Sequence, residues 1–341
     1  MDNAFISYLI EDRSYVSYIK REIHTGVVRA KFSETKVAEI DIVVSEITSN
    51  LIKHAGSGEL LYRIETSATI LTIEILSIDN GPGMADTAKM IKDGASTTHT
   101  LGQGLGAIHR LSDVAHVYSR LGWGTIVYSM IHERPTKTES SPSPSKGLVI
   151  SVSALCVPKA REKACGDGYR MRQIPGGVMI LFADGLGHGP QAKEAVDAAG
   201  DIFMNCSEIE PVAIARKLHE SIRKTRGLVG AIGVFNTKAN ELLFCGVGNI
   251  HSRYYNGITS RNFMSYNGTI GLNIPTSINA SRVSLEKNQH LILCSDGIQT
   301  RWDISKYPGI FKYSPMLLAA CIYKDHTRRT DDASVLIAKL S

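Results

Sequence analysis

The chain has 341 residues, of which 43% are hydrophobic and 21% are charged. Because domains usually span about 100–200 residues, this length predicts two domains, and the hydrophobic content excludes a mainly disordered chain. The formal net charge of +5 is spread along the sequence without a basic stripe interleaved with aromatic residues, so we expect no nucleic-acid binding. No apolar run approaches the ~18 residues that cross a bilayer, and we expect no membrane partner.

The first half of the sequence alternates helical and strand-like patterns. A long amphipathic helix is predicted over Glu34–Ala55, closed by Gly56, because its apolar residues recur every three or four positions. Around it we predict an apolar run at Phe5–Ile10, a helix over Asp12–His24, strands over Leu60–Thr66 and Ile70–Ile78, a helix from about Gly104, and strands over Ala115–Ser119 and Thr125–Ile131. This order predicts a layered α/β sandwich.

The long helix carries polar residues four positions apart on a face that is not its apolar face: Glu46, Asn50 and His54. Asparagine offers a neutral oxygen ligand for Mg²⁺, and glutamate can act as a base or hold a water molecule. The simpler alternative is a solvated polar face. Two further motifs decide between these interpretations.

Both motifs are rich in glycine. Asp79 ends a β-branched strand and opens the run Asp79-Asn80-Gly81-Pro82-Gly83, where glycines let backbone approach a ligand and the carboxylate suits an adenine amino group. The run Leu101-Gly102-Gln103-Gly104-Leu105-Gly106 opens a helix, and a glycine-rich helix N-terminus can cradle phosphate. Taken singly, these are an ordinary Asn-Gly turn and a helix cap.

Together, the order of these motifs, followed by Gly122-Trp123-Gly124-Thr125, resembles the GHKL ATPase family over about residues 5–132. The compact form is most similar to the small anti-sigma and switch serine kinases of the RsbT and RsbW type. The resemblance implies that Glu46 is the base, Asn50 binds the Mg²⁺ that accompanies ATP, and Asp79 contacts adenine. It also implies that the nucleotide is held by the following residues: Gly81, Gly83, Gly102, Gly104, Leu105, Gly106 and Thr125.

The stretch between Gly83 and Gly102, which would cover the nucleotide, is short, and its only lysines are Lys89 and Lys92. ATP binding is therefore a firmer expectation than kinase activity. A nucleotide-binding module that transfers no phosphate and only regulates the rest of the chain stays open as an alternative.

Residues 134–146 read RPTKTESSPSPSK and hold three of the chain's 11 prolines with no large apolar side chain, so we predict a linker there. It separates a domain over residues 1–133 from one over residues 147–341. In the second we predict strands over Leu148–Val157, Val178–Ala183, Val229–Phe235, Glu241–Gly246, His251–Tyr255, His290–Ser295 and Ala333–Leu340, and helices over Gln191–Cys206, Pro211–Arg226 and Pro315–Tyr323. This pattern predicts two sheets covered by helices.

Four aspartate motifs stand out in this half, and three of them lie at the ends of predicted strands. The motifs are Cys165-Gly166-Asp167-Gly168, Ala183-Asp184-Gly185-Leu186-Gly187-His188-Gly189, Cys294-Ser295-Asp296-Gly297 and Asp331-Asp332. Aspartate is depleted within strands, and carboxylates gathered at one rim of a sheet would repel each other unless a cation lay among them. Oxygen ligands favour Mg²⁺ or Mn²⁺, and two such ions can activate water against a phosphoryl group. The alternative is that Asp-Gly only forms turns.

These motifs in this order resemble the metal-dependent protein phosphatases of type 2C, in the SpoIIE-like and RsbX-like branch. The resemblance implies an αββα sandwich with two Mn²⁺ or Mg²⁺ ions, in which Asp184 is central to catalysis and bridges the metals. The carbonyl of Gly185 also binds, and Asp167, Asp296 and Asp332 complete the ligand set, with Asp332 preferred to Asp331. His188 is either an acid for the leaving group or a loop-packing residue. No arginine matches the phosphate-binding arginine of eukaryotic relatives.

Both resemblances together imply a bifunctional bacterial signalling protein. Its phosphatase would act on phosphoserine or phosphothreonine of a STAS-domain antagonist or stressosome-type phosphoprotein, and its switch-kinase module would oppose it in partner switching. Direct binding of a sigma factor, as an anti-sigma factor, is a further alternative. The six cysteines are scattered without a CxxC pair, and the N-terminal run lacks the pattern of a secretory signal, so we expect free thiols, no zinc site and a cytoplasmic protein.

Overall fold

The computed structural model describes residues 4–67, 69–87, 104–134 and 148–341. They form two compact units, one holding strands β1 to β5 and the other strands β6 to β15, and each is described by itself. Most of the predicted linker lies outside the described residues, so the proposed domain limits stay predictions. In the described ranges, no helix combines the length and the apolar character that crossing a bilayer would need.

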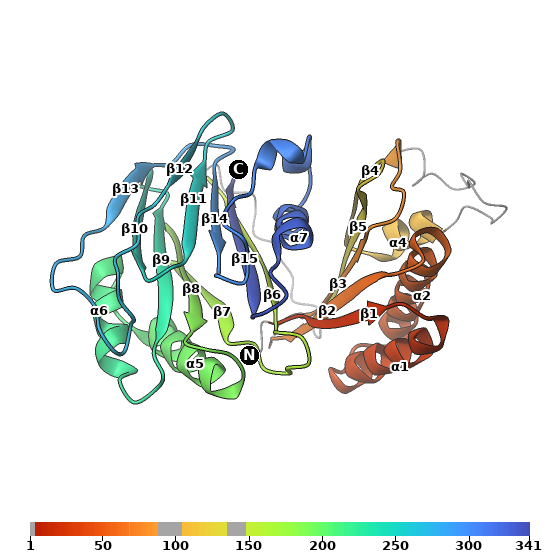
Figure 1. Ribbon diagram of the computed structural model, residues 1–341, viewed down its shortest axis with the longest axis horizontal. Helices are drawn as coiled ribbons and strands as arrows, with labels where there is room; N and C mark the ends of the chain where they lie inside the picture. Colours follow the sequence, from red (N-terminus) through yellow and green to blue (C-terminus); the bar gives the residue numbers. More distant parts are fainter. Residues whose placement is uncertain (1–3, 68, 88–103, 135–147) are drawn as a thin grey trace. The chain divides into compact units, whose positions relative to one another are not determined.

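The first unit is a five-stranded antiparallel sheet, in the order β1-β2-β3-β5-β4, with helices on one face (Figure 1). Its elements in chain order are β1 (Ile6–Ile10), α1 (Arg13–Arg29), α2 (Glu34–Asn50), η1 (Leu51–Ala55), β2 (Gly58–Thr66), β3 (Leu71–Asp79), α4 (Gly104–Leu111), β4 (Val114–Arg120) and β5 (Gly124–Glu133). The predicted α/β sandwich is confirmed.

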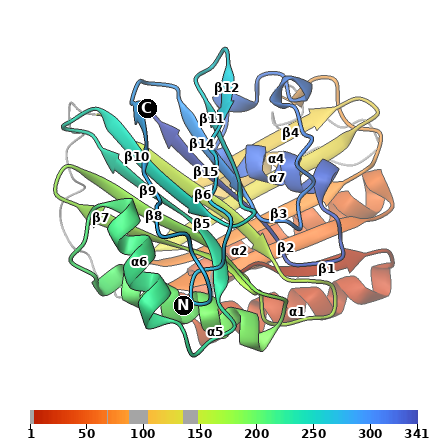
Figure 2. The same ribbon diagram turned by 60° about the vertical axis from the view of Figure 1, so that its left-hand side comes forward.

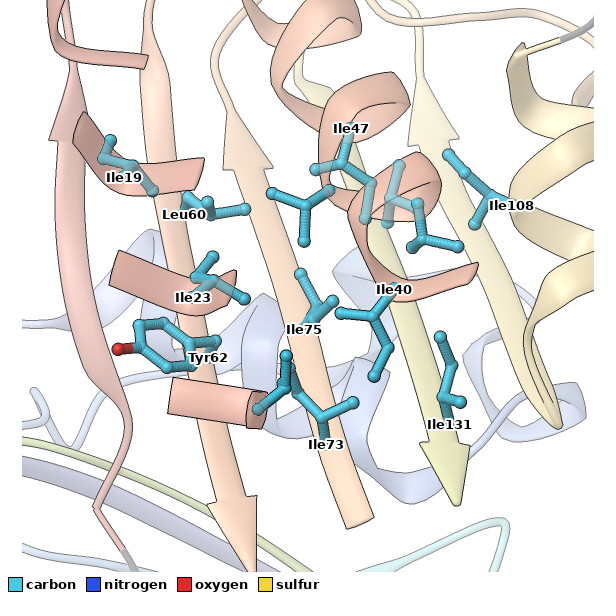
Figure 3. Packing of buried hydrophobic residues seen from close by; sticks show 14 of the residues in the cluster. Ile19, Ile23, Ile40, Ile47, Leu60, Tyr62, Ile73, Ile75, Ile108 and Ile131 are labelled. Atoms are coloured by element: carbon cyan, nitrogen blue, oxygen red, sulfur yellow. The ribbon is translucent and has the colours of Figure 1, made fainter. Parts of the chain in front are cut away.

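The core of the first unit lies between this sheet and its helices. Figure 3 shows Ile23 of α1 and Ile40 of α2 directed toward Ile73 and Ile75 of β3, and all four side chains are fully buried. Burying one such side chain contributes about 1.5–3 kcal/mol. The three- and four-residue spacing of the apolar positions therefore fixes α2 against β3, and with it the polar face of α2 that carries Glu46 and Asn50.

The long predicted helix ends in a different kind of turn from the one expected. Its first part is α2, but its last five residues form the π-helix η1, and Gly56 closes it with φ +78°. A π turn is wider than an α turn. His54 lies within this π-helical turn and is exposed.

The second unit contains two five-stranded sheets, in the orders β13-β10-β9-β8-β7 and β12-β11-β14-β15-β6. Helices α5 and α6 pack on the first sheet and α7 lies over the second (Figures 1 and 2). The elements from residue 148 onward are β6 (Ile150–Val157), β7 (Asp167–Ile174), β8 (Gly177–Gly185), α5 (Pro190–Asn205), α6 (Pro211–Ser221), β9 (Leu228–Asn236), β10 (Glu241–Val247), β11 (His251–Tyr255), β12 (Ser260–Asn262), β13 (Ser281–Ser284), β14 (His290–Cys294), η2 (Ile304–Lys306), η3 (Ile310–Lys312), α7 (Pro315–His326) and β15 (Ala333–Leu340). Of these residues, Gly309–Leu317, which contain η3 and the start of α7, belong to the first unit. The αββα sandwich is confirmed.

Two details of the second unit differ from expectation. Strands β7, β12 and β13 occupy segments where no strand was predicted. Helix α6 ends at Ser221, and its last backbone turn is followed by a bend in which the Thr225 amide donates to the Ile222 carbonyl. Arg226, predicted as the last residue of that helix, therefore lies outside it.

Candidate functional sites

The start of α4 lies against the polar face of α2. A Cβ added at Gly104 would come within 2.6 Å of Glu46 Oε2 and 3.7 Å of Asn50 Oδ1, so glycine is the residue that lets α4 approach this closely. Glu46 and Asn50 are both half-buried. Leu105 packs against the apolar core and Gly106 is buried, while Gly102, Lys89 and Lys92 lie outside the described residues. The structure thus brings Glu46 and Asn50 together with Gly104, the first described residue of the second glycine motif.

Asp79, at the end of β3, is held by backbone. Its Oδ1 accepts hydrogen bonds from the amides of Gly81, at 2.8 Å, and Thr125, at 3.0 Å. Gly124 has φ +113°, and a Cβ there would come within 2.1 Å of the Asp79 carbonyl oxygen. The carboxylate of Asp79 therefore connects its own turn with the start of β5, which lies 46 residues later in the sequence.

Ser119 is a residue of this site that the sequence did not indicate. Its Oγ accepts from the Met84 amide at 2.8 Å, donates to the Gly124 carbonyl at 2.9 Å and lies 2.8 Å from Thr125 Oγ1. A serine inside strand β4 carries no sequence signal for this role. It fixes the turn after Gly83 against the β4–β5 hairpin, and so supports both Asp79 and Thr125.

In the second unit, the predicted carboxylates come from neighbouring strands of both sheets. Asp167 begins β7 and stands directly opposite Asp184 of β8 in their antiparallel pair. Asp296 follows β14, and the Asp331-Asp332 pair precedes β15, which is the neighbour of β14 in the second sheet. Strand pairing in each sheet therefore gathers the four motifs at one end of the sandwich.

Ser295 links the two groups of carboxylates. Its hydroxyl donates to Asp167 Oδ2 at 2.7 Å, and its Oγ accepts from the Ser334 amide at 3.0 Å. All three residues are buried. Because Asp167 belongs to the first sheet while Ser295 and Ser334 belong to the second, this chain of hydrogen bonds fixes the two sheets relative to each other beside the carboxylates.

A cavity of about 440 Å³ opens among these carboxylates and is lined by Asp184, Asp296 and Asp331. The other lining residues are Leu186, Gly187, Val229, Gly248, Asn249, Asn267 and Gly268. Asn249 Nδ2 donates to Asp296 Oδ2 at 3.1 Å and so orients one of the three acids. Gly248 and Asn249, which follow β10, thus both form part of the cavity wall.

Asp331 and Asp332 face different partners. Asp332 is buried, and its two carboxylate oxygens accept hydrogen bonds from the amides of Lys159 and Gly166, each at 2.7 Å. Asp331 accepts from the Asp332 amide at 2.9 Å and lines the cavity. Asp332 thus holds the loop before β7 in place, whereas Asp331 presents its carboxylate to the same space as Asp184 and Asp296.

Without a cation, keeping these clustered carboxylates ionised costs free energy. Burial raises the pKa of Asp184 far above its usual range, and the neighbouring Asp167, Asp296 and Asp331 raise it further. Burial also raises the pKa of Asp167 and of Asp332, partly offset by their hydrogen bonds. Within the described residues, no group of three or more histidine, cysteine, aspartate or glutamate side chains is arranged closely enough to hold a metal ion as it stands. Nevertheless, an all-oxygen set of mutually repelling carboxylates fits a hard divalent cation.

His188, in the loop after Asp184, contacts a glutamate outside the cavity lining. His188 Nδ1 lies 2.5 Å from Glu162 Oε1, and a Cβ at Gly189 would come within 2.7 Å of Glu162 Oε2. The amide of Gly185 donates to the Gly166 carbonyl at 3.0 Å. His188 therefore helps to join the loops that precede β7 and follow β8.

Comparison with known proteins follows the same division of the chain. Residues 12–129 match the family model of the histidine kinase-like ATPase domain, and residues 174–341 match that of stage II sporulation protein E (SpoIIE). The serine/threonine-protein kinase RsbT of Bacillus subtilis strain 168 is 31% identical over 99 residues, which cover 29% of this chain and 74% of RsbT. The phosphoserine phosphatase RsbX of the same strain is 23% identical over 187 residues, covering 54% of this chain and 91% of RsbX.

Solved structures match the second unit in fold. A chain from a study of the bacterial stressosome aligns with a TM-score of 0.51 and 25% identity, covering 57% of this chain and 100% of that one. RsbX in complex with magnesium aligns with a TM-score of 0.50 and 22% identity, covering 58% of this chain and 98% of that one. The chain therefore belongs to the histidine kinase-like ATPase domain family in its N-terminal part and to the SpoIIE family of type 2C phosphatases in its C-terminal part.

Proposed function

We propose that the second unit is a Mg²⁺- or Mn²⁺-dependent phosphatase that removes phosphate from serine or threonine of a STAS-domain regulator in a partner-switching pathway. The observation that carries this proposal is the cavity lined by Asp184, Asp296 and Asp331, with Asp167 opposite Asp184 in the strand pair. The likeness to RsbX, named as a phosphoserine phosphatase, supports the reaction class, and the likeness to a stressosome structure supports the class of partner.

The proposed metal ligands are Asp167, Asp184, the carbonyl of Gly185, Asp296 and Asp331. When bound, the ions would activate water and neutralise the charge of a phosphoryl group. The protein contributes a rigid frame: Ser295 holds Asp167, Asn249 holds Asp296, and Asp332 holds the loop before β7. The sequence preferred Asp332 to Asp331 as a ligand, but both oxygens of Asp332 accept backbone hydrogen bonds.

The direct test is phosphate release from a phosphorylated STAS-domain protein. We expect release with Mn²⁺ or Mg²⁺ and none after treatment with a chelator, because the carboxylates need the cation both for charge balance and for reaction. A phosphotyrosine peptide serves as the specificity control. Release that continues undiminished in the chelator would contradict the proposal.

Substitutions at Asp331 and Asp332 are expected to have different effects. D331N removes a charge from the cavity wall and should weaken Mn²⁺ binding about 10-fold or more, with little change in stability. D332A leaves the Lys159 and Gly166 amides without their acceptor and should lower the free energy of unfolding by about 2–4 kcal/mol. Calorimetric Mn²⁺ titration and urea unfolding measure the two effects. D332N keeps one acceptor oxygen for the backbone amides. If D331N bound Mn²⁺ with wild-type affinity while D332N lost Mn²⁺ binding, Asp332 would be the metal ligand, as the sequence predicted.

For the first unit, we propose ATP binding with Mg²⁺ and transfer of phosphate to serine or threonine of the same STAS-domain partner. The meeting of Glu46, Asn50 and the Gly104 helix start supports nucleotide binding, since a base, an oxygen ligand and a helix N-terminus lie together. The 31% identity to the kinase RsbT supports transfer.

Kinase activity is best tested in a phosphatase-deficient background, because the second unit would erase the product. In the D184N protein, ATP and the STAS-domain partner should yield phosphopartner, and the additional change E46A should abolish it while ATP binding persists. Measured ATP binding without any phosphopartner in D184N would favour the alternative in which the first unit only regulates the phosphatase. Phosphosite mapping by mass spectrometry provides the measurement.

A further inference from the structure

Arg226 lies beside the loop that follows Asp184. The Leu186 amide donates to the Gly227 carbonyl at 3.1 Å, and the Leu228 amide and carbonyl pair with Ile270, so the backbone on both sides of this contact is fixed. Gly187 has φ +83°, and a Cβ added to it would come within 3.1 Å of Arg226 Nη1. The guanidinium group therefore lies against Gly187.

Gly187 is part of the cavity wall that also contains Asp184, Asp296 and Asp331. The Arg226 guanidinium consequently lies at the edge of the acidic cavity. Arg226 is exposed, and among the described residues its side chain forms no ion pair or hydrogen bond with the protein. A guanidinium group has five N–H donors in a planar arrangement that matches two oxygens of a phosphoryl group.

We propose that Arg226 binds the phosphoryl group of the substrate and places it over the carboxylate cavity. This inference rests on the proposed phosphatase function for its substrate class, a phosphoserine or phosphothreonine segment of a protein. The residue supplies the positive charge for which the sequence offered no match, and it does so from the turn between α6 and β9. Because Gly187 leaves space for the guanidinium, the pair Gly187 and Arg226 forms one phosphate-binding feature.

The experiment compares R226A, R226K and R223A. Arg223 is exposed in the same turn; burial lowers the pKa of His219, and the charge of Arg223 lowers it further. R223A therefore removes the same charge from a nearby position and serves as the matched control. Two readouts are used: the steady-state kinetics of phosphate release from the phosphoprotein and from p-nitrophenyl phosphate, and the affinity for inorganic phosphate in the presence of Mg²⁺, measured by calorimetry.

In R226A we expect KM for both substrates, and the dissociation constant of inorganic phosphate, to rise about 10- to 100-fold, because a charge-assisted bidentate contact is lost. The change in kcat should be smaller than that in KM, since the contact exists before and during the reaction. R226K keeps the charge without the planar fork and should lie between R226A and wild type. R223A should match wild type.

Phosphate affinity in R226A within twofold of wild type, or equal losses in R226A and R223A, would overturn the inference. A KM effect confined to the phosphoprotein would also overturn it, because it would place Arg226 on the protein part of the substrate. Failure of the proposed function is distinguishable: if the wild-type protein releases no phosphate but binds it in an Arg226-dependent manner, the phosphatase proposal falls and the binding site stands.

Discussion

Replacing Asp184 by asparagine is expected to lower metal-dependent phosphate release by about 10³-fold. Asp184 stands opposite Asp167 in the β7–β8 pair and lines the cavity with Asp296 and Asp331, so it is central among the proposed ligands. Removing its charge weakens the hold on the ions, whose charge stabilisation is worth several kcal/mol. The measurements are phosphate release from the phosphoprotein against Mn²⁺ concentration and calorimetric Mn²⁺ affinity.

The same variant should be more stable than wild type in a chelator, by about 1–3 kcal/mol in urea unfolding. The reason is that a neutral amide replaces a buried carboxylate whose pKa is raised by burial and by three neighbouring acids. Loss of activity with a gain in stability cannot come from unfolding. D201N, on the exposed side of α5, is the matched control and should keep full activity. Full phosphatase activity in D184N would refute the proposed site.

D79N is expected to weaken ATP binding by about 10²-fold while leaving the fold intact. The asparagine oxygen can still accept the hydrogen bonds from the Gly81 and Thr125 amides. However, the second carboxylate oxygen, an acceptor, is replaced by an NH₂ group, which is a donor. The adenine amino group, which is proposed to bind there, is also a donor, so the hydrogen bond is lost. A charge-assisted hydrogen bond is worth about 1.5–3 kcal/mol, which corresponds to this loss of affinity. Calorimetry or a fluorescent nucleotide gives the dissociation constant.

The companion variant D79A separates binding from structure. It leaves both backbone amides without their acceptor and should lower the free energy of unfolding by about 2–4 kcal/mol, which D79N should not do. S119A, which removes the hydroxyl next to Thr125, should reduce stability but change ATP affinity less than D79N. If D79N bound ATP as tightly as wild type, the adenine role of Asp79 would be wrong.

The strands that sequence reasoning missed share one property. In the two sheet orders, β13 and β7 are the edges of the first sheet, and β12 is an edge of the second. An edge strand is covered less completely and needs fewer apolar residues, as the fully exposed pattern of β12 and the alternating burial of β13 show. The interior strands, such as β8 and β14, are mainly apolar and almost entirely buried, and they were predicted within a few residues.

Some residues of the candidate sites can be predicted from local sequence patterns, whereas the roles of others depend on contacts with segments distant in sequence. Motifs that combine an unusual residue with a strand end, such as Asp184 after an apolar run, are visible in the sequence. The separation of Asp331 from Asp332 is not, because adjacent carboxylates look alike until their partners, Lys159 and Gly166, are known. Arg226 and Ser119 are invisible for the same reason: each owes its role to a segment distant in sequence, Gly187 for one and Met84 for the other.

The pairing of β15 with β6 has a consequence for the order in which the protein is made. Residues 150–157 find their partner only at residues 333–340, and Asp332 ties the loop before β7 to the same late segment. In contrast, all five strands of the sheet in the first unit, β1 to β5, have been synthesised by residue 133. Because domains fold as units during synthesis, the nucleotide-binding fold precedes the phosphatase fold on the growing chain. A chain interrupted before residue 333 would therefore carry the first fold without a completed acidic cavity.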